Sequence, residues 1–163
     1  RDGTVYVADY NKFYGENATS YDEVANWTDV VDIADEVVGP IVGLKSDGTV
    51  VCSKDELKNP YGKVFNNPNA FDTSEWKDII AISQNGHSLL GLKRDGTVVA
   101  TGGNEHNQLD ISDWHDIVAI SAGGWISIGL KSDGTLVMAG DCGNIDLPDL
   151  SDMKDLYVPT IKY

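Results

Sequence analysis

The chain has few cysteines and few basic residues, and each shortage excludes a class of site or partner. Only two cysteines, Cys52 and Cys142, occur among its 163 residues, and no Cys-x-x-Cys pair suggests a zinc site. The chain contains 12 lysines and arginines and 26 aspartates and glutamates, so its net charge is −14. Phosphate-backbone partners need clustered basic residues, so we do not expect nucleic acid to bind. The acidic charge is compatible with a basic protein partner, and the alternative, which we favour, is a solvated acidic surface with no such role.

Long apolar runs are also missing. No stretch approaches the roughly 20 apolar residues that span a membrane. With 41% hydrophobic residues, the chain has the composition of one globular domain with its own core. It carries no signal peptide and begins at Arg1 inside a repeat, so we expect a piece of something longer. The compartment stays open, with a bacterial secreted or cell-surface location as the one we favour.

What the chain has in abundance is internal repetition. An Asp-Gly-Thr phrase recurs at 2–4, 47–49, 95–97 and 133–135, with spacings of 45, 48 and 38 residues. A Trp-x-Asp phrase keeps step with it, beginning at Trp27, Trp76 and Trp114, and Met153 begins a weaker copy. Such a period indicates one supersecondary unit copied in tandem. We expect a single domain, 1–163, with repeats over roughly 1–46, 47–94, 95–132 and 133–163.

The clearest unit predicts three short antiparallel strands. Residues 78–83 form an Ile-rich run of strand length, a break at 84–86 follows, and a second strand is expected over 87–93. Asp95-Gly96 predicts a tight two-residue hairpin, after which 98–101 return as the third strand. The glycines of these turns, Gly48, Gly96 and Gly134, and the tryptophans Trp27, Trp76 and Trp114 are therefore expected to be structural. So is Cys52, at a position where the other repeats carry Ala100 and Met138.

The strands are continuous apolar runs, such as Ile79-Ile80 and Val98-Val99, rather than alternating ones. A strand of this kind is covered on both faces. Antiparallel hairpins covered on both faces and repeated every 38 to 48 residues predict an all-β fold, a β-propeller. Small residues such as Gly91 and Gly129 are expected where sheets approach closely. The structural alternative is a stacked β-solenoid. A helical solenoid is not expected, because no unit sustains a helical period of apolar residues.

The ordered phrases Asp-Ile-[IV]-Ala-Ile-Ser, Gly-His-Ser and Gly-Leu-Lys-x-Asp-Gly-Thr-Val resemble the repeat of the regulator of chromosome condensation family. The likeness covers nearly the whole chain. It implies β-propeller blades, commonly seven to a ring, whereas about four units are present here. We expect a segment of a larger ring; pairing of two copies and a small closed ring are the alternatives. The family histidine, present as His87, is replaced by Gly39 and Trp125 in other repeats.

No residues declare a catalytic, metal or cofactor site. The three histidines, His87, His106 and His115, have no carboxylates at metal-ligand spacing around them. His87 is expected to bond backbone within the propeller, and His115 to be solvated. The aspartates of the Asp-Gly-Thr and Trp-x-Asp phrases recur because the turns and the starts of strands need them. No calcium-loop spacing is present.

Binding residues are expected where the copies differ. Trp125 replaces the histidine before a second strand and is the main candidate for a partner contact, with His87 at the equivalent position. Two inserts after third strands carry further aromatic residues, among them Tyr14, Tyr61 and Phe65. The structural alternatives are that Trp125 plugs the central channel and that the insert aromatics pack against an outer strand.

The favoured function is therefore a non-enzymatic scaffold that binds a protein through one end of a propeller. A nucleotide-exchange activity on a small GTPase is implied only by the family resemblance. A cell-surface or carbohydrate-binding role and an enzyme such as a lyase or glycosidase are the remaining alternatives.

Overall fold

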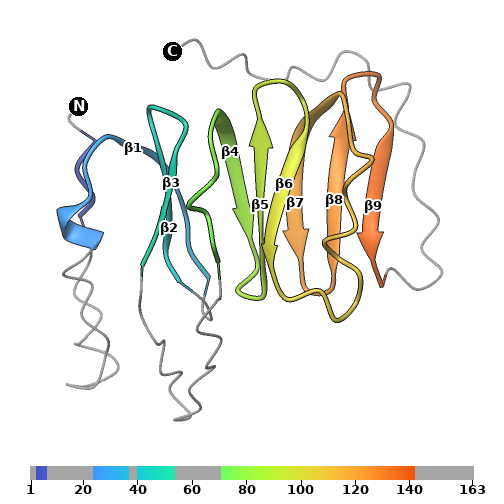
Figure 1. Cartoon of the computed structure of the whole chain (residues 1–163), viewed down its shortest axis with the longest axis horizontal. Coiled ribbons are helices and arrows are strands. Elements are labelled where there is room, and N and C mark those ends of the chain that lie inside the picture. The colour runs from blue at the N-terminus through green and yellow to red at the C-terminus, as the bar shows by residue number, and fades with distance from the viewer. Residues whose placement is uncertain (1–2, 7–23, 37–39, 54–70, 142–163) are drawn as a thin grey trace.

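The computed structural model describes residues 3–6, 24–36, 40–53 and 71–141. They form three antiparallel sheets of three strands, each in sequential order (Figure 1). The first sheet contains β1 (Val30–Ala34), β2 (Val42–Lys45) and β3 (Val50–Cys52), and a short 3-10 helix, η1 (Val24–Asn26), precedes it. The second contains β4 (Ile79–Gln84), β5 (Ser88–Lys93) and β6 (Val98–Gly102), and the third β7 (Ile117–Gly123), β8 (Ile126–Lys131) and β9 (Leu136–Gly140).

The sheets pack face to face, with one apolar core in each gap. The first core joins sheets one and two through Val42, Leu44, Val50, Trp76, Ile79 and Leu89. The second joins sheets two and three through Leu90, Leu92, Ile111, Trp114, Ile117 and Ala139. Within β5, Leu89 faces the first core while Leu90 and Leu92 face the second. The continuous apolar run is therefore explained, because neighbouring sheets cover both faces of this strand.

This arrangement is that of successive blades of a β-propeller, as the sequence predicts. The sheets stand side by side across the long dimension of the molecule (Figure 1). The predicted strand ranges of the clearest unit agree with β4, β5 and β6 to within one residue at each end. The fourth sequence unit, with its Met153 phrase, lies outside the described residues. No helix among the described residues is long and apolar enough to cross a membrane.

Each tryptophan of the Trp-x-Asp phrases lies against a glycine of the second strand in its own blade. A Cβ added at Gly91 would come within 2.6 Å of Trp76, and one added at Gly129 within 2.9 Å of Trp114. Only a glycine leaves room for the indole. The sequence predicts a close approach of sheets at these glycines, and the structure shows that the tryptophan side chain, packed in the core between two blades, fills the space above each of them.

The hairpins at the Asp-Gly-Thr phrases differ from the predicted two-residue turn. Gly96 N donates to Lys93 O at 3.0 Å, and Lys93 N donates to Thr97 O at 2.9 Å, which closes a three-residue loop. Only the glycine has a positive φ, 82° at Gly96, whereas a two-residue turn of the Asp-Gly kind needs positive φ at both residues. Asp95 has no positive φ, and its Oδ1 accepts hydrogen bonds from Thr97 N and Oγ1 at 2.9 and 2.6 Å.

The same hairpins join one blade to the next. Ile79 N donates to Gly48 O at 3.0 Å, and Ile117 N donates to Gly96 O at 2.9 Å. The aspartate just before each of these isoleucines has a positive φ, 60° at Asp78 and 58° at Asp116. Its carbonyl accepts a hydrogen bond from the second-strand end of its own blade, from Arg94 N or Ser132 N. The two sets of repeated aspartates therefore organise turns and the starts of strands, as the sequence predicts.

Candidate functional site

Antiparallel pairing gives the row of blades two different rims. One rim carries the Asp-Gly-Thr hairpins that join second and third strands, and we call it the Asp-Gly-Thr rim. The other carries the turns that join first and second strands, at 85–87 and 124–125, and the backbone that leaves the third strands at Gly103 and Asp141. We call it the Trp125 rim.

A cluster of three aromatic rings from two blades lies on the Trp125 rim. The ring of His87 lies 5.1 Å from that of Trp125, and the ring of His106 lies 4.4 Å from it, measured between centroids. Both imidazoles are tilted against the indole, by 38° and 37°. Trp125 remains 45% exposed, one of the few large apolar side chains so exposed among the described residues. An exposed tryptophan held by neighbours is a typical anchor for a partner.

His87 and Trp125 occupy the same backbone position in consecutive blades. The carbonyl of His87 accepts from Gly103 N at 2.8 Å, and that of Trp125 accepts from Asp141 N at 3.1 Å. A Cβ added to the last residue of the third strand, Gly102 or Gly140, would clash with the carbonyl oxygen of His87 or Trp125, respectively. Both of these glycines have positive φ, 116° and 108°. The repeated backbone therefore places a variable side chain at a constant location on the rim.

Asn85 connects the turn of the second blade to that of the third. Its Oδ1 accepts hydrogen bonds from His87 N at 2.8 Å and Ser88 N at 2.9 Å. Its Nδ2 donates to Gly123 O and, at 3.3 Å, to Gly124 O. These carbonyls directly precede Trp125, so one amide side chain orients both turns. Because the acceptor and both donors are used, replacing Asn85 would release the two turns from each other.

The third ring comes from the loop that follows β6, and that loop is held from inside. Gln108 is fully buried and its Oε1 accepts from His106 N at 2.9 Å. Asn104 Oδ1 accepts from Leu109 N at 2.7 Å. Asn107 has a φ of 60°, a conformation that asparagine tolerates better than most residues. His106 is therefore held in place against Trp125.

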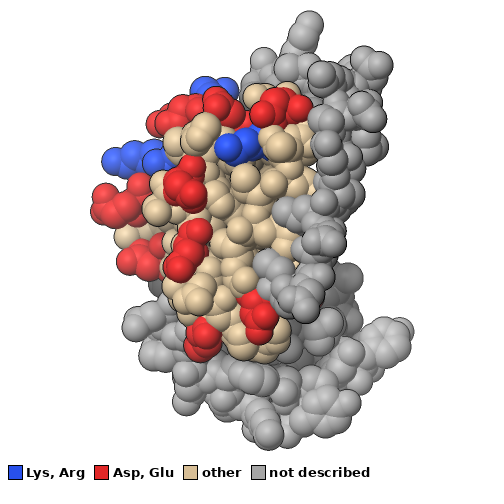
Figure 2. Space-filling model, turned by 90° about the vertical axis from the view of Figure 1, so that its right-hand side faces the viewer, with Lys and Arg blue, Asp and Glu red and all other residues tan. Residues whose placement is uncertain are grey.

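Charge is distributed unequally between the rims. The described residues contain five basic side chains, all in or beside an Asp-Gly-Thr or Trp-x-Asp phrase: Lys45, Lys77, Lys93, Arg94 and Lys131. The described part of the Trp125 rim has none and carries carboxylates instead, Asp35, Glu36, Glu105 and Asp141. Figure 2 shows the face of the third blade: Lys and Arg lie only in its upper part, whereas Asp and Glu continue to its lower end.

One of these carboxylates adjoins the aromatic cluster. Asp141 Oδ2 lies 3.9 Å from His106 Nδ1, and the Asp141 side chain is 66% exposed. Asp141 is also the residue whose backbone N–H binds the carbonyl of Trp125. The cluster thus has an aromatic surface with a carboxylate at its edge.

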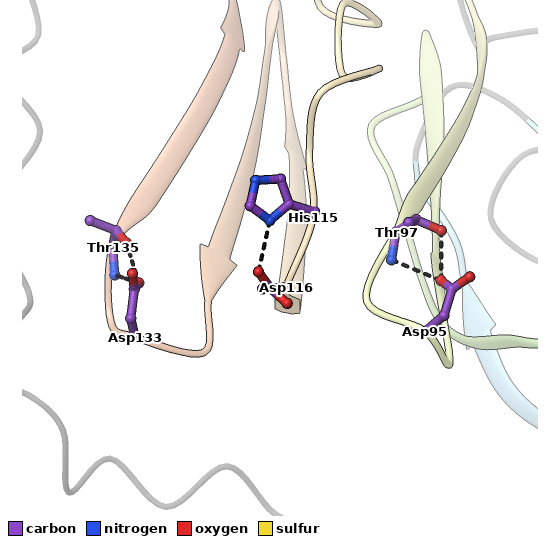
Figure 3. A network of polar contacts seen from close by, with 6 residues as sticks. All are labelled: Asp95, Thr97, His115, Asp116, Asp133 and Thr135. Atoms are coloured by element: carbon purple, nitrogen blue, oxygen red, sulfur yellow. Dashed lines mark hydrogen bonds and ion pairs between the residues drawn. The ribbon is translucent and has the colours of Figure 1, made fainter.

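The Asp-Gly-Thr rim offers carboxylates of a different kind. Hydrogen bonds from the hydroxyl and backbone N–H of Thr97 lower the pKa of Asp95, and Thr49 and Thr135 do the same for Asp47 and Asp133. Figure 3 shows two of these pairs with His115, whose Nδ1 lies 2.7 Å from Asp116 Oδ2. His115 is exposed, as the sequence predicts. Among the described residues, no group of three or more histidine, cysteine or acidic side chains could hold a metal ion.

The predicted binding residues are only partly described. Trp125 and His87, taken from separate repeats, lie in ring contact. Tyr14, Tyr61 and Phe65 lie outside the described residues, as does Cys142. Sequence reasoning did not select His106, Asn85 or Asp141. A signal for Asn85 was present, because the equivalent residue of the next repeat is Gly123, and such differences are where a repeat protein places its binding residues.

No protein-family model matches the chain, and a search of curated proteins found no significant match. Among solved structures, the chain is similar to Prp20p from Saccharomyces cerevisiae, with 20% identity, 68% of this chain and 30% of that chain covered, and a TM-score of 0.49. It is also similar to human WBSCR16, with 16% identity, 74% of this chain and 36% of that chain covered, and a TM-score of 0.48. A third is the CRINKLY WD40 ectodomain of the Arabidopsis thaliana receptor kinase ACR4, with 17% identity, 73% and 39% covered, and a TM-score of 0.46.

Prp20 is also named yeast RCC1, which belongs to the family that the repeat of this chain resembles. The chain matches about a third of the length of these proteins. The propeller blades are assigned from the three sheets of this chain and the cores between them.

Proposed function

We propose that this chain is a non-enzymatic scaffold that binds a partner protein through the Trp125 rim. The observation that supports this most directly is the cluster of Trp125, His87 and His106. Three rings from two blades are held together there, and the largest is nearly half exposed. A large aromatic side chain exposed in this way adds nothing to a core and is the kind of residue that dominates binding at protein interfaces.

The scaffold around the cluster is suited to binding because its backbone is already in place. Hydrogen bonds within the chain hold the three residues, from the side chains of Asn85 and Gln108 and from the backbone N–H groups of Gly103 and Asp141. A partner would therefore meet an organised surface and would lose little affinity to the ordering of loops.

The test compares capture of partner proteins by the immobilised chain and by two variants. Trp125→Ala removes the anchor, and Lys131→Ala is the matched control because it alters the Asp-Gly-Thr rim. We expect the original chain and the Lys131→Ala variant to capture the same proteins in similar amounts. The Trp125→Ala variant should capture roughly tenfold less of them, or still less. Circular dichroism and denaturation of each variant check that it is folded.

Equal capture by the Trp125→Ala variant and the original chain would overturn this assignment of the surface. Two further assays separate the alternative functions from the scaffold. A glycan array reports carbohydrate binding, and nucleotide release from a panel of small GTPases reports exchange activity. A positive result in either assay that Trp125→Ala leaves unchanged would place the function elsewhere.

A further inference from the structure

The aromatic cluster has the chemistry to select one kind of side chain from a partner. The faces of indole and imidazole rings are electron-rich, and among side chains the indole attracts cations most strongly. The imidazoles of His87 and His106 flank the indole at tilts of 38° and 37° rather than lying flat on it, and Trp125 is 45% exposed. An incoming cation can therefore reach the indole.

The surroundings of the cluster favour a positive charge. Asp141 Oδ2 lies 3.9 Å from His106 Nδ1, and the exposed Glu105 directly precedes His106 in the loop. The described part of this rim contains no lysine or arginine, whereas the opposite rim holds all five of those described. A cationic group that approaches the Trp125 rim is thus attracted by carboxylates and meets no described basic side chain that would repel it.

The shape of the cluster favours a guanidinium over an ammonium ion. A guanidinium is planar and weakly hydrated, so it can lie flat on an aromatic face while its N–H groups point outward in the ring plane. A carboxylate at the edge of the rings, such as that of Asp141, is placed to accept those N–H groups in the strong, charge-assisted manner. A lysine ammonium is a compact and strongly hydrated charge without a flat face, so it gains less from the indole and makes no bidentate contact with the carboxylate.

We propose that the cluster of His87, Trp125 and His106 recognises an arginine side chain of the partner, with the guanidinium on the indole and hydrogen-bonded to Asp141. This inference rests on the proposed function, because it states which group of a partner protein the Trp125 rim receives. The partner segment is accordingly basic and presents an exposed arginine.

The probe is a short blocked peptide, acetyl-Gly-Arg-Gly-amide, added to the full chain with ¹⁵N-labelled tryptophan. Matched peptides carry lysine or citrulline in place of arginine; citrulline keeps the planar shape and loses the charge. We expect the indole N–H signal of Trp125 to shift on titration while those of Trp27, Trp76 and Trp114 stay unchanged. Binding should be about tenfold weaker for citrulline and about threefold weaker for lysine.

Three variants sharpen the test. Trp125→His places at this position the residue that the preceding repeat carries, so the fold is preserved, and binding of the arginine peptide should fall about fivefold. Because that variant lacks the Trp125 signal, its affinity is read by calorimetry. Asp141→Asn should weaken binding about threefold to tenfold, whereas Asp113→Asn, which removes an equal charge beside Trp114, should leave it unchanged.

The proposal is overturned if the citrulline peptide binds as well as the arginine peptide. It is equally overturned if Asp113→Asn weakens binding as much as Asp141→Asn, because the attraction would then be to overall charge. If the peptides fail while Trp125→Ala still abolishes capture of a partner, the scaffold function stands and only the arginine assignment fails. If the arginine peptide does not bind and Trp125→Ala does not reduce capture of a partner, both proposals fail.

Discussion

The two rims of the blades are built from the same strands but follow different rules. On the Asp-Gly-Thr rim, the hairpins at 47–49, 95–97 and 133–135 each bond a threonine to an aspartate. The carbonyls of Gly48 and Gly96 each accept a hydrogen bond from the next blade. On the Trp125 rim, the backbone repeats but the side chains change, from His87 to Trp125 and from Asn85 to Gly123. The contrast teaches that repetition marks the scaffold, whereas departures from it mark the surface available to a partner.

The largest expected difference between the rims concerns two tryptophans. Trp76→Ala should lower the free energy of unfolding by about 3–5 kcal/mol, because this side chain is 8% exposed and fills the gap between two blades above Gly91. Trp125→Ala should lower it by less than about 1 kcal/mol, since 45% of this residue is exposed and it belongs to neither core. Urea denaturation followed by circular dichroism measures both. A larger loss in the Trp125 variant would mean that this residue belongs to the scaffold.

A pair of glycines sharpens the same comparison with a smaller effect. Gly96 has a φ of 82° and a Cβ there would lie 3.3 Å from Asp116 Cα of the next blade, so Gly96→Ala should cost about 1–2 kcal/mol. Gly124, on the Trp125 rim, has open space where a Cβ would be added, and Gly124→Ala should change stability by no more than about 0.5 kcal/mol. Thermal or urea denaturation of the two variants side by side decides this. Equal losses would remove the distinction between the rims.

The pH dependence of the Asp-Gly-Thr rim is a third expected difference. Because hydrogen bonds from Thr97 hold the pKa of Asp95 below its ordinary value of 3.8, the folded state favours the charged carboxylate. This contribution to stability is complete above the unfolded pKa and is lost as the pH falls through the lower, folded value. Carboxyl ¹³C titration should place the Asp95 midpoint below 3.8, and Thr97→Val should raise it towards 3.8.

Thr97→Ser is the control for that titration, because it keeps the hydroxyl and should keep the lowered midpoint. If Thr97→Val left the Asp95 midpoint in place, the threonine would not be the cause of the low pKa.

The smallest effect concerns the chemical reactivity of Cys52, which ends β3. Burial raises the pKa of its thiol to about 11 from 9.0, which reduces the reactive thiolate at neutral pH about 100-fold. In a Cys142→Ser variant, iodoacetamide at pH 8 should therefore modify native Cys52 far more slowly than the urea-unfolded chain. Rapid modification of the native protein would show that the end of this strand is open to solvent, as Trp125 is.

Much of the scaffold could be predicted because its signals are local. Continuous apolar runs locate β4, β5 and β6 to within a residue, since a strand covered on both faces must be apolar throughout. The hairpin geometry could not be predicted in the same way. An Asp-Gly pair suits a two-residue turn as well as the observed three-residue loop. In the loop that forms, Gly96 lies close to the backbone of Asp116 in the next blade, a contact that the pair alone does not indicate.

The candidate site was predictable one residue at a time. Trp125 and His87 are conspicuous because each is an aromatic ring at a position that varies between repeats. Their contact is not a local property, since it depends on how closely two blades pack. His106 is less visible in the sequence: it precedes Trp125 by 19 positions, in a loop whose path is set by the buried Gln108.

By itself, the sequence of this protein determined the repeat, the strands, the blade-to-blade glycines and tryptophans, and an overall acidic charge. Those properties follow from short-range chemistry: apolar runs, glycine without a side chain, and a threonine two residues after an aspartate. Only the tertiary structure decided that the five described basic residues gather on one rim and that three rings and a carboxylate meet on the other. That outcome depends on the packing of whole sheets. Packing brings together residues that are far apart along the chain, and their separation in the sequence does not indicate how close they lie in space.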